Sequence, residues 1–304
     1  MQHHLTRSDG HPLNPNVRKQ RTLAQKVEVQ GFGYWSGRDV RVEFRPAAAD
    51  SGVVFVRSDQ NPPRRIEASP AHRIETPRRT TLAASGVTVE MVEHVMAALG
   101  GMHVDNCEVW LDSPELPGCD GSSQVFVDAL LRAGIVEQDA WRPQLVVTEV
   151  TRVGDEDCWI EARPAATPGL FIKYRLDYGP GAPISRQTLQ LAVTPETFQR
   201  ELAPARTFIL KHEAEWLRER GLGARVTSSD LLVFDDDGPL ENELRFPDEC
   251  VRHKALDLVG DLALTGCDFV GQFVAHRSGH RLNAELVKAI LMEGQMTDLR
   301  RRTA

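Results

Sequence analysis

The sequence predicts an α+β protein made of two similar α/β units. In the first half the predicted elements run strands, helix, strand, helix, and the second half ends helix, strand, helix. Segments 92–100 and 251–260 align on a histidine inside a helix, and an apolar strand follows each helix. This internal similarity indicates a duplication. Two such units packed face to face would bring their equivalent helices together.

The N-terminal residues 1–20 are polar and contain no apolar segment of the kind found in signal peptides. We expect a disordered tail here, and we assign His3, His4 and His11 to it rather than to a metal site. Nowhere in the chain does an apolar run approach the roughly 18 residues that a membrane-spanning helix needs. The sequence therefore predicts a protein that does not span a membrane.

The first α/β unit is expected over residues 21–142. A glycine-punctuated stretch at 31–37 separates two runs in which apolar and polar residues alternate, as in a β-hairpin. Helical spacing and the pair Gly100–Gly101 place the first helix. The predicted elements are strands at 26–30, 40–44 and 52–57, irregular or short strand structure at 73–85, a helix at 87–99, a strand at 104–111 and a helix at 122–133.

The second unit is expected over residues 143–304, after a boundary near 140–144 that includes Pro143. Its strands are predicted from alternation and its helices from apolar spacing. The predicted elements are strands at 145–150, 159–162, 170–174 and 189–193, a helix at 213–220, a strand at 231–234 with a turn at 235–238, a helix within 246–266, a strand at 269–275 and a helix at 282–292.

The helix within 246–266 carries the strongest chemical signal. Pro247 near its start and Gly266 after its last apolar residue bracket it. His253, Asp257 and Asp261 follow at intervals of four, so they project from one face of the helix. An imidazole and a carboxylate one turn apart can hold a divalent cation. Taken alone, this spacing is better explained as a solvated helix face. A metal site would therefore need a further ligand from elsewhere in the chain.

The duplication supplies that ligand, because the equivalent helix carries His94. His94, His253 and Asp257 form a set of two imidazoles and one carboxylate, typical of a catalytic zinc site, and iron(II) also fits such a set. Glu93, adjacent to His94, is a candidate general base, with a surface helix acid as the alternative.

A second histidine signal lies at 276–283, where a strand ends and a helix begins. His280 is a candidate general acid, held as imidazolium by a carboxylate such as Asp261, and the alternative is a solvent-exposed histidine at a helix start. Lys254 and Arg277 would place cations beside the metal, suitable for binding phosphate, unless both belong to an ordinary charged surface.

Composition excludes several classes of protein. Of the 304 residues 41% are hydrophobic and 26% charged, as in soluble globular proteins. The net charge of −7 argues against nucleic-acid binding, which usually requires a basic face. The five cysteines are scattered and contain no CxxC pair, so we expect neither a disulfide framework nor a thiolate zinc site. A reducing cytoplasm fits this pattern.

Taken together, these segments resemble one known family. The order and spacing match over about residues 20–290, in the segments 92–100, 105–106 with 113–122, 205–208, 244–261 and 278–283. They are similar to the zinc-dependent UDP-3-O-acyl-N-acetylglucosamine deacetylases of lipid A biosynthesis. The resemblance implies a fold in which helices are sandwiched between two sheets, and a monomer that acts in the cytoplasm, close to the inner-membrane surface.

The resemblance also implies a role for each matching residue. The metal ligands would be His94, His253 and Asp257; the base Glu93; the acid His280, oriented by Asp261; the oxyanion donor Thr207; and the substrate contacts Phe208, Lys254 and Arg277. An insert at about 209–226 would shape the passage for the acyl chain. The expected reaction removes acetate from the 2-acetamido group of a UDP-linked, 3-O-acylated glucosamine.

The chain departs from the family in its first hairpin, where Tyr34–Trp35 stands in place of the family's Leu-His between Gly33 and Ser36. This difference leaves open a paralogue that deacetylates another N-acetylated amphiphile. A catalytically silent binding or regulatory homologue is a second alternative, although no ligand, base or acid has been lost. A purely structural zinc would require four protein ligands.

Overall fold

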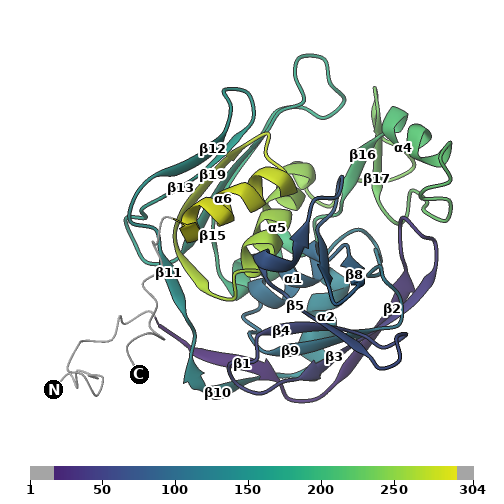
Figure 1. The fold of residues 1–304 in the computed structure, drawn as a ribbon. Coiled ribbons are helices and arrows are strands. Elements are labelled where there is room, and N and C mark those ends of the chain that lie inside the picture. The colour runs from purple at the N-terminus through teal and green to yellow at the C-terminus, as the bar shows by residue number, and fades with distance from the viewer. Residues whose placement is uncertain (1–16, 293–304) are drawn as a thin grey trace.

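The computed structural model describes residues 17–292, and in it helices lie between two sheets (Figure 1). Helix α1 (Glu93–Gly101) and helix α5 (Glu249–Ala263) contact each other at the centre of the molecule. Helix α2 (Gln124–Ala133) packs on α1, and α6 (His280–Met292) packs on α5. The predicted α+β fold with helices between two sheets is therefore confirmed.

The first sheet has five strands, in the spatial order β2 (Val27–Phe32), β3 (Asp39–Pro46), β9 (Cys107–Leu111), β4 (Val53–Arg57) and β5 (Arg64–Glu67). Strand β9 lies in the middle, antiparallel to β3 and parallel to β4. The predicted hairpin is the antiparallel pair β2–β3, with Val29 opposite Val42. Val42 and Phe44 are fully buried, so this face of the sheet packs on the core.

The second sheet repeats this arrangement, in the order β12 (Thr151–Gly154), β13 (Trp159–Arg163), β19 (Asp268–His276), β14 (Leu170–Leu176) and β15 (Gln187–Val193). Its central strand β19 is antiparallel to β13 and parallel to β14, and the short strand β11 (Gln144–Val146) pairs with its start. In both sheets the last strand in sequence occupies the middle. This common order supports the division into units 21–142 and 143–304, which, like the duplication, stays a prediction.

Three smaller structures surround the two sheets. Strands β1 (Lys19–Leu23) and β10 (Ile135–Trp141) form an antiparallel pair. A three-stranded sheet follows the 3-10 helix at Pro70–His72 and contains β6 (Arg73–Ile74), β7 (Thr81–Ala84) and β8 (Val87–Glu90). The third structure contains β16 (Phe208–Leu210), α4 (Lys211–Arg218), β17 (Leu232–Asp235) and β18 (Gly238–Pro239), at the upper right of Figure 1. A short helix α3 (Pro195–Thr197) continues into a π-helical turn at Phe198–Leu202.

Two sequence-based boundaries were wrong. The helix predicted over 87–99 begins only at Glu93, because residues 87–90 form strand β8, in which Val89 is buried. Met91 then has a φ of +59°, which is incompatible with an α-helix and separates the strand from the helix. The tail expected over 1–20 is folded from residue 17 in the described structure. Arg18 pairs there with Asp105 at 2.6 Å and Asp268 at 2.8 Å. Residues 1–16 lie outside the described part of the chain.

The insert expected at about 209–226 is larger in the structure. Its sheet begins at Phe208 and ends at Pro239, because β16 pairs with β17, which follows the α4 segment. The predicted turn at 235–238 is confirmed as the link between β17 and β18, where Asp235 pairs with Gly238. Among the described helices none has the length and apolar content needed to cross a bilayer.

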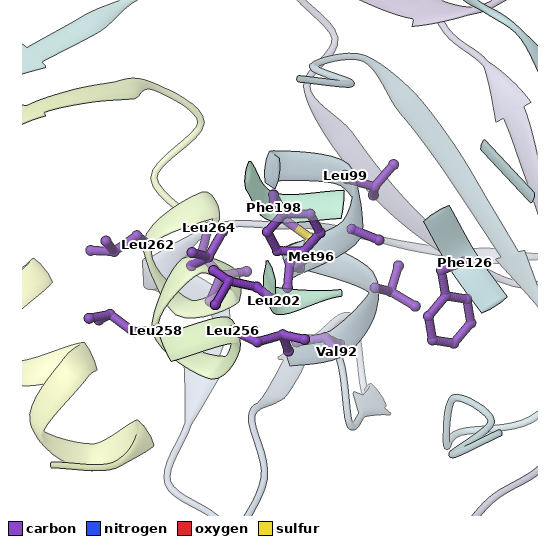
Figure 2. Close-up of a cluster of buried hydrophobic side chains, with 14 of the residues drawn as sticks. Val92, Met96, Leu99, Phe126, Phe198, Leu202, Leu256, Leu258, Leu262 and Leu264 are labelled. Carbon is purple, nitrogen blue, oxygen red and sulfur yellow. The ribbon is translucent and has the colours of Figure 1, made fainter. Parts of the chain in front are cut away.

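The core between α1 and α5 fixes the distance between the two helices. Figure 2 shows Val92 and Met96 of α1 facing Leu256 and the π-helical residues Phe198 and Leu202, in a cluster of buried apolar side chains that also includes Leu99. Gly260 on α5 lies directly against the backbone of α1. A Cβ at this position would lie 2.2 Å from the carbonyl oxygen of Glu93, closer than any real contact. The helices can approach this closely only because residue 260 is glycine.

Gly260→Ala is therefore expected to lower the free energy of unfolding by about 1–3 kcal/mol, since the backbone must move to admit the methyl group. The substitution should also weaken metal binding, because it separates His94 on α1 from the ligands on α5. Denaturant unfolding and metal titration measure both effects. Gly279→Ala is the matched control, since apart from residue 279 and its two chain neighbours no atom among the described residues lies within 4 Å of its Cβ position. Unchanged stability and metal affinity in Gly260→Ala would contradict this account of the helix contact.

Candidate active site

Three potential metal ligands converge where α1 meets α5. His94 lies in the first turn of α1, and His253 and Asp257 lie one turn apart on α5. Asp257 Oδ1 is 3.3 Å from His253 Nε2 and 3.8 Å from His94 Nε2. All three side chains are buried, and their ligand atoms lie within 4.8 Å of one another. The packing of the two helices thus joins ligands that are about 160 residues apart in sequence.

The hydrogen bonds around these side chains fit a bound cation. Asp257 Oδ1 is buried without a hydrogen-bond partner among the described residues, while Oδ2 accepts a bond from Lys254 Nζ at 2.6 Å. His253 Nδ1 donates to the carbonyl oxygen of Ala205 at 3.1 Å, which leaves the Nε2 lone pair directed toward Asp257. An unpartnered carboxylate oxygen and a free imidazole nitrogen therefore face the same point.

The protonation states also fit a metal site. Burial lowers the pKa of His94 to about 3 and also lowers the pKa of His253, so both imidazoles are neutral at pH 7. Burial alone would raise the pKa of Asp257, but His253 and Lys254 outweigh it and hold that pKa well below its usual range. Two neutral imidazoles and one carboxylate are suitable ligands for a divalent cation such as zinc.

Beside these ligands a carboxyl group and a histidine face each other. Glu93 Oε1 and His280 Nε2 are 4.0 Å apart, and His280 Nδ1 donates to Asp261 Oδ2 at 2.9 Å. Burial raises the pKa of Glu93 to about 7. For His280, burial lowers the pKa, but the carboxylate of Asp261 outweighs this effect and raises it to about 9. At neutral pH the pair thus contains a protonated imidazole and a carboxyl group close to its titration midpoint.

The ligands and this pair lie on the wall of a half-open cavity of about 530 Å³. Phe208 packs edge-on against His253, with ring centroids 6.2 Å apart, and Thr207 lies beside it. Lys254 and Arg277 line the same cavity. One part of the lining is apolar and comes from the insert; it consists of Ile209, Leu217, Leu222, Val226, Leu231 and Val233. The structure thus brings together all the residues that the sequence singled out.

The cations have closer partners than the sequence suggested. The ammonium group of Lys254 pairs with Asp257, so part of its charge is directed to one of the candidate metal ligands. Burial opposes the charge on Lys254, but Asp257 outweighs it and raises the Lys254 pKa. Arg277 pairs with Asp177 at 3.0 Å and has a buried Nε without a hydrogen-bond partner among the described residues. Asp177 was not singled out from the sequence.

Tyr34 and Trp35, the two residues of the first hairpin that depart from the family pattern, also line the cavity. The hydroxyl group of Tyr34 lies within hydrogen-bonding distance of the carbonyl oxygens of Asp230 and Cys119, so it connects the hairpin to the insert. Trp35 packs under the guanidinium group of Arg79, 4.5 Å from the ring centroid. This departure from the family pattern therefore lies on the cavity wall, and the three candidate metal ligands are all present.

Sequence reasoning missed two further residues of this site. Thr80 donates its backbone N–H to Glu93 and its hydroxyl to Asp261, and it lies in a stretch without helical or strand periodicity. Asn283 donates to Asp261 Oδ2 at 2.8 Å. Asn283 lies seven residues after the end of β19 and three after His280, and this position offered a signal for it. No sequence pattern indicated Thr80.

The site combines two buried histidines and one aspartate with a neighbouring carboxyl group and a protonated histidine, at the wall of a cavity. Metal-dependent hydrolases have this arrangement. The model of the UDP-3-O-acyl N-acetylglycosamine deacetylase family matches residues 20–292. The chain belongs to this family.

Named relatives agree with the family match. A UDP-3-O-acyl-N-acetylglucosamine deacetylase of Actinobacillus succinogenes is 40% identical, and one of Haemophilus influenzae is 38% identical; each alignment covers 90% of both chains. The enzyme of the same name from Anaeromyxobacter dehalogenans is 39% identical over 90% of this chain and 88% of its own. The resemblance inferred from the motifs is therefore confirmed.

Proposed function

We propose that this protein is a zinc-dependent deacetylase that hydrolyses the 2-acetamido group of a UDP-3-O-acyl-N-acetylglucosamine and releases acetate. The converging ligand atoms of His94, His253 and Asp257, beside the Glu93–His280 pair, are the observation that carries this proposal. The relatives act on the substrate in their names, a step that belongs to lipid A biosynthesis. On this proposal the chain works in the cytoplasm as a monomer, close to the inner-membrane surface.

The metal would be held by His94, His253 and Asp257. Zinc in that position polarises a carbonyl group and lowers the pKa of a water molecule towards neutrality, and iron(II) is the alternative ion. Glu93 takes a proton from the attacking water, for which a pKa near 7 is suitable. His280 gives a proton to the nitrogen that leaves, and Asp261 keeps the Nδ1–H of His280 directed to itself so that Nε2 carries the transferable proton.

The remaining residues bind and orient the substrate. The hydroxyl group of Thr207 donates a hydrogen bond to the oxygen that becomes negatively charged during attack. Phe208 forms a wall beside the sugar, and the cations of Lys254 and Arg277 face the sugar or the diphosphate. The apolar lining from the insert is suitable for the acyl chain, whose burial excludes water from that part of the cavity.

Acetate release by the purified protein tests this proposal. Turnover of UDP-3-O-acyl-N-acetylglucosamine is expected to disappear after chelation and to return with one equivalent of zinc, while restoration with iron(II) under anaerobic conditions tests the alternative ion. UDP-N-acetylglucosamine without the acyl chain serves as a matched substrate and should be turned over far more slowly. Stoichiometric zinc binding without acetate release would contradict the proposal.

A second candidate is a deacetylase for a different N-acetylated amphiphile, which the presence of Tyr34 and Trp35 on the cavity wall favours. The same assay distinguishes the two. Zinc-dependent acetate release from another acylated N-acetylhexosamine, at a higher kcat/KM than from the UDP-linked substrate, would favour this second function.

A further inference from the structure

Thr80 contacts both members of the acid–base pair. It lies in the link between β6 and β7, and its side chain is completely buried. Its backbone N–H donates to Glu93 Oε2 at 2.9 Å, and its hydroxyl donates to Asp261 Oδ1 at 2.7 Å. The same hydroxyl oxygen is 3.2 Å from His280 Nδ1. One residue of the first unit therefore touches the base and also reaches the acid and its orienting carboxylate in the second unit.

The hydrogen bonds of Asp261 show what the Thr80 hydroxyl contributes. Oδ2 accepts from His280 Nδ1 at 2.9 Å and from Asn283 Nδ2 at 2.8 Å. Oδ1 accepts from Thr80, which is its one hydrogen-bond donor within residues 17–292. A carboxylate bonded on both oxygens cannot rotate without breaking a bond. Removing the hydroxyl would leave Oδ1 buried and unpaired, and Asp261 could turn away from His280.

The Thr80 backbone is itself held in place. Its carbonyl oxygen accepts a hydrogen bond from the backbone N–H of Val92, immediately before α1, at 3.2 Å. The N–H that meets Glu93 is therefore fixed relative to the helix that carries Glu93 and His94. The backbone of Thr80 thus contacts the base from one side while its side chain extends to the acid on the other.

We propose that Thr80 is a positioning residue that holds Glu93 and the Asp261–His280 pair in one geometry across the two units. This inference rests on the proposed deacetylase function, in which a proton leaves the water at Glu93 and another arrives at the amine from His280. Both transfers need the 4.0 Å arrangement of Glu93 and His280 to persist while the substrate is bound. Thr80 does not line the cavity, and its hydrogen-bond partners among residues 17–292 do not include the three candidate metal ligands.

Thr80→Val tests the hydroxyl alone, since it keeps the shape and the backbone N–H. We expect kcat to fall about 10–100-fold, with KM changed less than about threefold and one equivalent of zinc still bound. Thr80→Ser, which restores the hydroxyl, should recover kcat to within about threefold of the parent. Thr22→Val is the matched control: Thr22 is also buried and donates a hydrogen bond, to Asn106 O at 2.7 Å, but contacts no residue of the site. Its kcat should remain near the parental value.

Several results would overturn the inference. A Thr80→Val enzyme with kcat within threefold of the parent, or a loss that Thr80→Ser does not recover, would leave Thr80 with a structural role at most. Loss of zinc together with activity would lead to the same conclusion. If Thr80→Val does not fold, Thr80→Ala with Thr80→Ser makes the same comparison.

Failure of the proposed function is recognised separately, because the parental enzyme would then release no acetate. Crystal structures of the zinc-loaded parent and Thr80→Val decide the inference in that case. If Thr80 is a positioning residue, the Asp261 carboxylate or the His280 ring will change orientation in the Thr80→Val structure. Identical positions of both groups would overturn it.

Discussion

Glu93→Gln is expected to lower kcat by about 10²–10⁴-fold, the usual contribution of a general base, while zinc remains bound. Glutamine has nearly the same shape as glutamate and still accepts the Thr80 N–H through its amide oxygen, but it cannot take a proton from water. The metal ligands are unchanged, so metal content separates loss of the base from loss of the site. Steady-state kinetics with metal analysis measures both.

The pH profile gives an independent sign of the same role. Because burial raises the pKa of Glu93 to about 7, the base is protonated at lower pH, and kcat/KM of the parent should fall as pH drops below about 7. Glu93→Gln should lack this acidic limb. The exposed Glu196 provides a control, since Glu196→Gln should keep both rate and profile. A zinc-loaded Glu93→Gln enzyme with more than a tenth of parental turnover would rule out this base.

His280→Ala is expected to have a comparable effect, again about 10²–10⁴-fold on kcat, because the amine would leave without a proton donor. Asp261 and the neighbouring carboxylates raise the pKa of His280 to about 9, so the acid is charged at pH 7 and loses its proton above that pKa. The parental kcat/KM should therefore decline above about pH 9 and be highest between the two limbs. In His280→Ala the alkaline limb should disappear.

His276→Ala is a demanding control for this prediction, because His276 belongs to the same strand-to-helix segment. Its ring packs on Trp159, with centroids 6.0 Å apart, and does not line the cavity. Its replacement should leave turnover near the parental value. Near-parental turnover in zinc-loaded His280→Ala, or an alkaline limb with an unchanged midpoint, would exclude His280 as the acid.

Local chemistry explains why much of this site was accessible from sequence. The four-residue interval between His253 and Asp257 places both side chains on one face of any helix, and the structure has that helix at Glu249–Ala263. His94 could be added because its segment resembles the one around His253. The strand–helix junction at His280 could likewise be predicted, because the spacing of apolar residues changes there from the alternation of a strand to the spacing of a helix.

Elsewhere the same local reasoning gave wrong boundaries or none. Residues 87–90 continue the apolar pattern of the following helix, yet they pair with β7 as strand β8. Residues 1–20 were expected to be disordered because they are polar, but Arg18 pairs with Asp105 and Asp268. In the first case a local hairpin with β7 overrides the helical pattern. In the second case the partners of Arg18 lie 87 and 250 residues away, which no sequence window spans.

The sequence by itself determined the fold class. It also singled out the candidate metal ligands, acid and base, from residue types, from spacing within one helix or junction, and from the similarity of the segments around His94 and His253. Only the tertiary structure decided that Glu93 and His280 face each other at 4.0 Å, that Lys254 pairs with Asp257, and that Thr80 reaches Asp261. These contacts require α1 and α5 to approach as closely as Gly260 allows. Helical periodicity orients side chains within one element, whereas the distance between elements is set by how their surfaces pack.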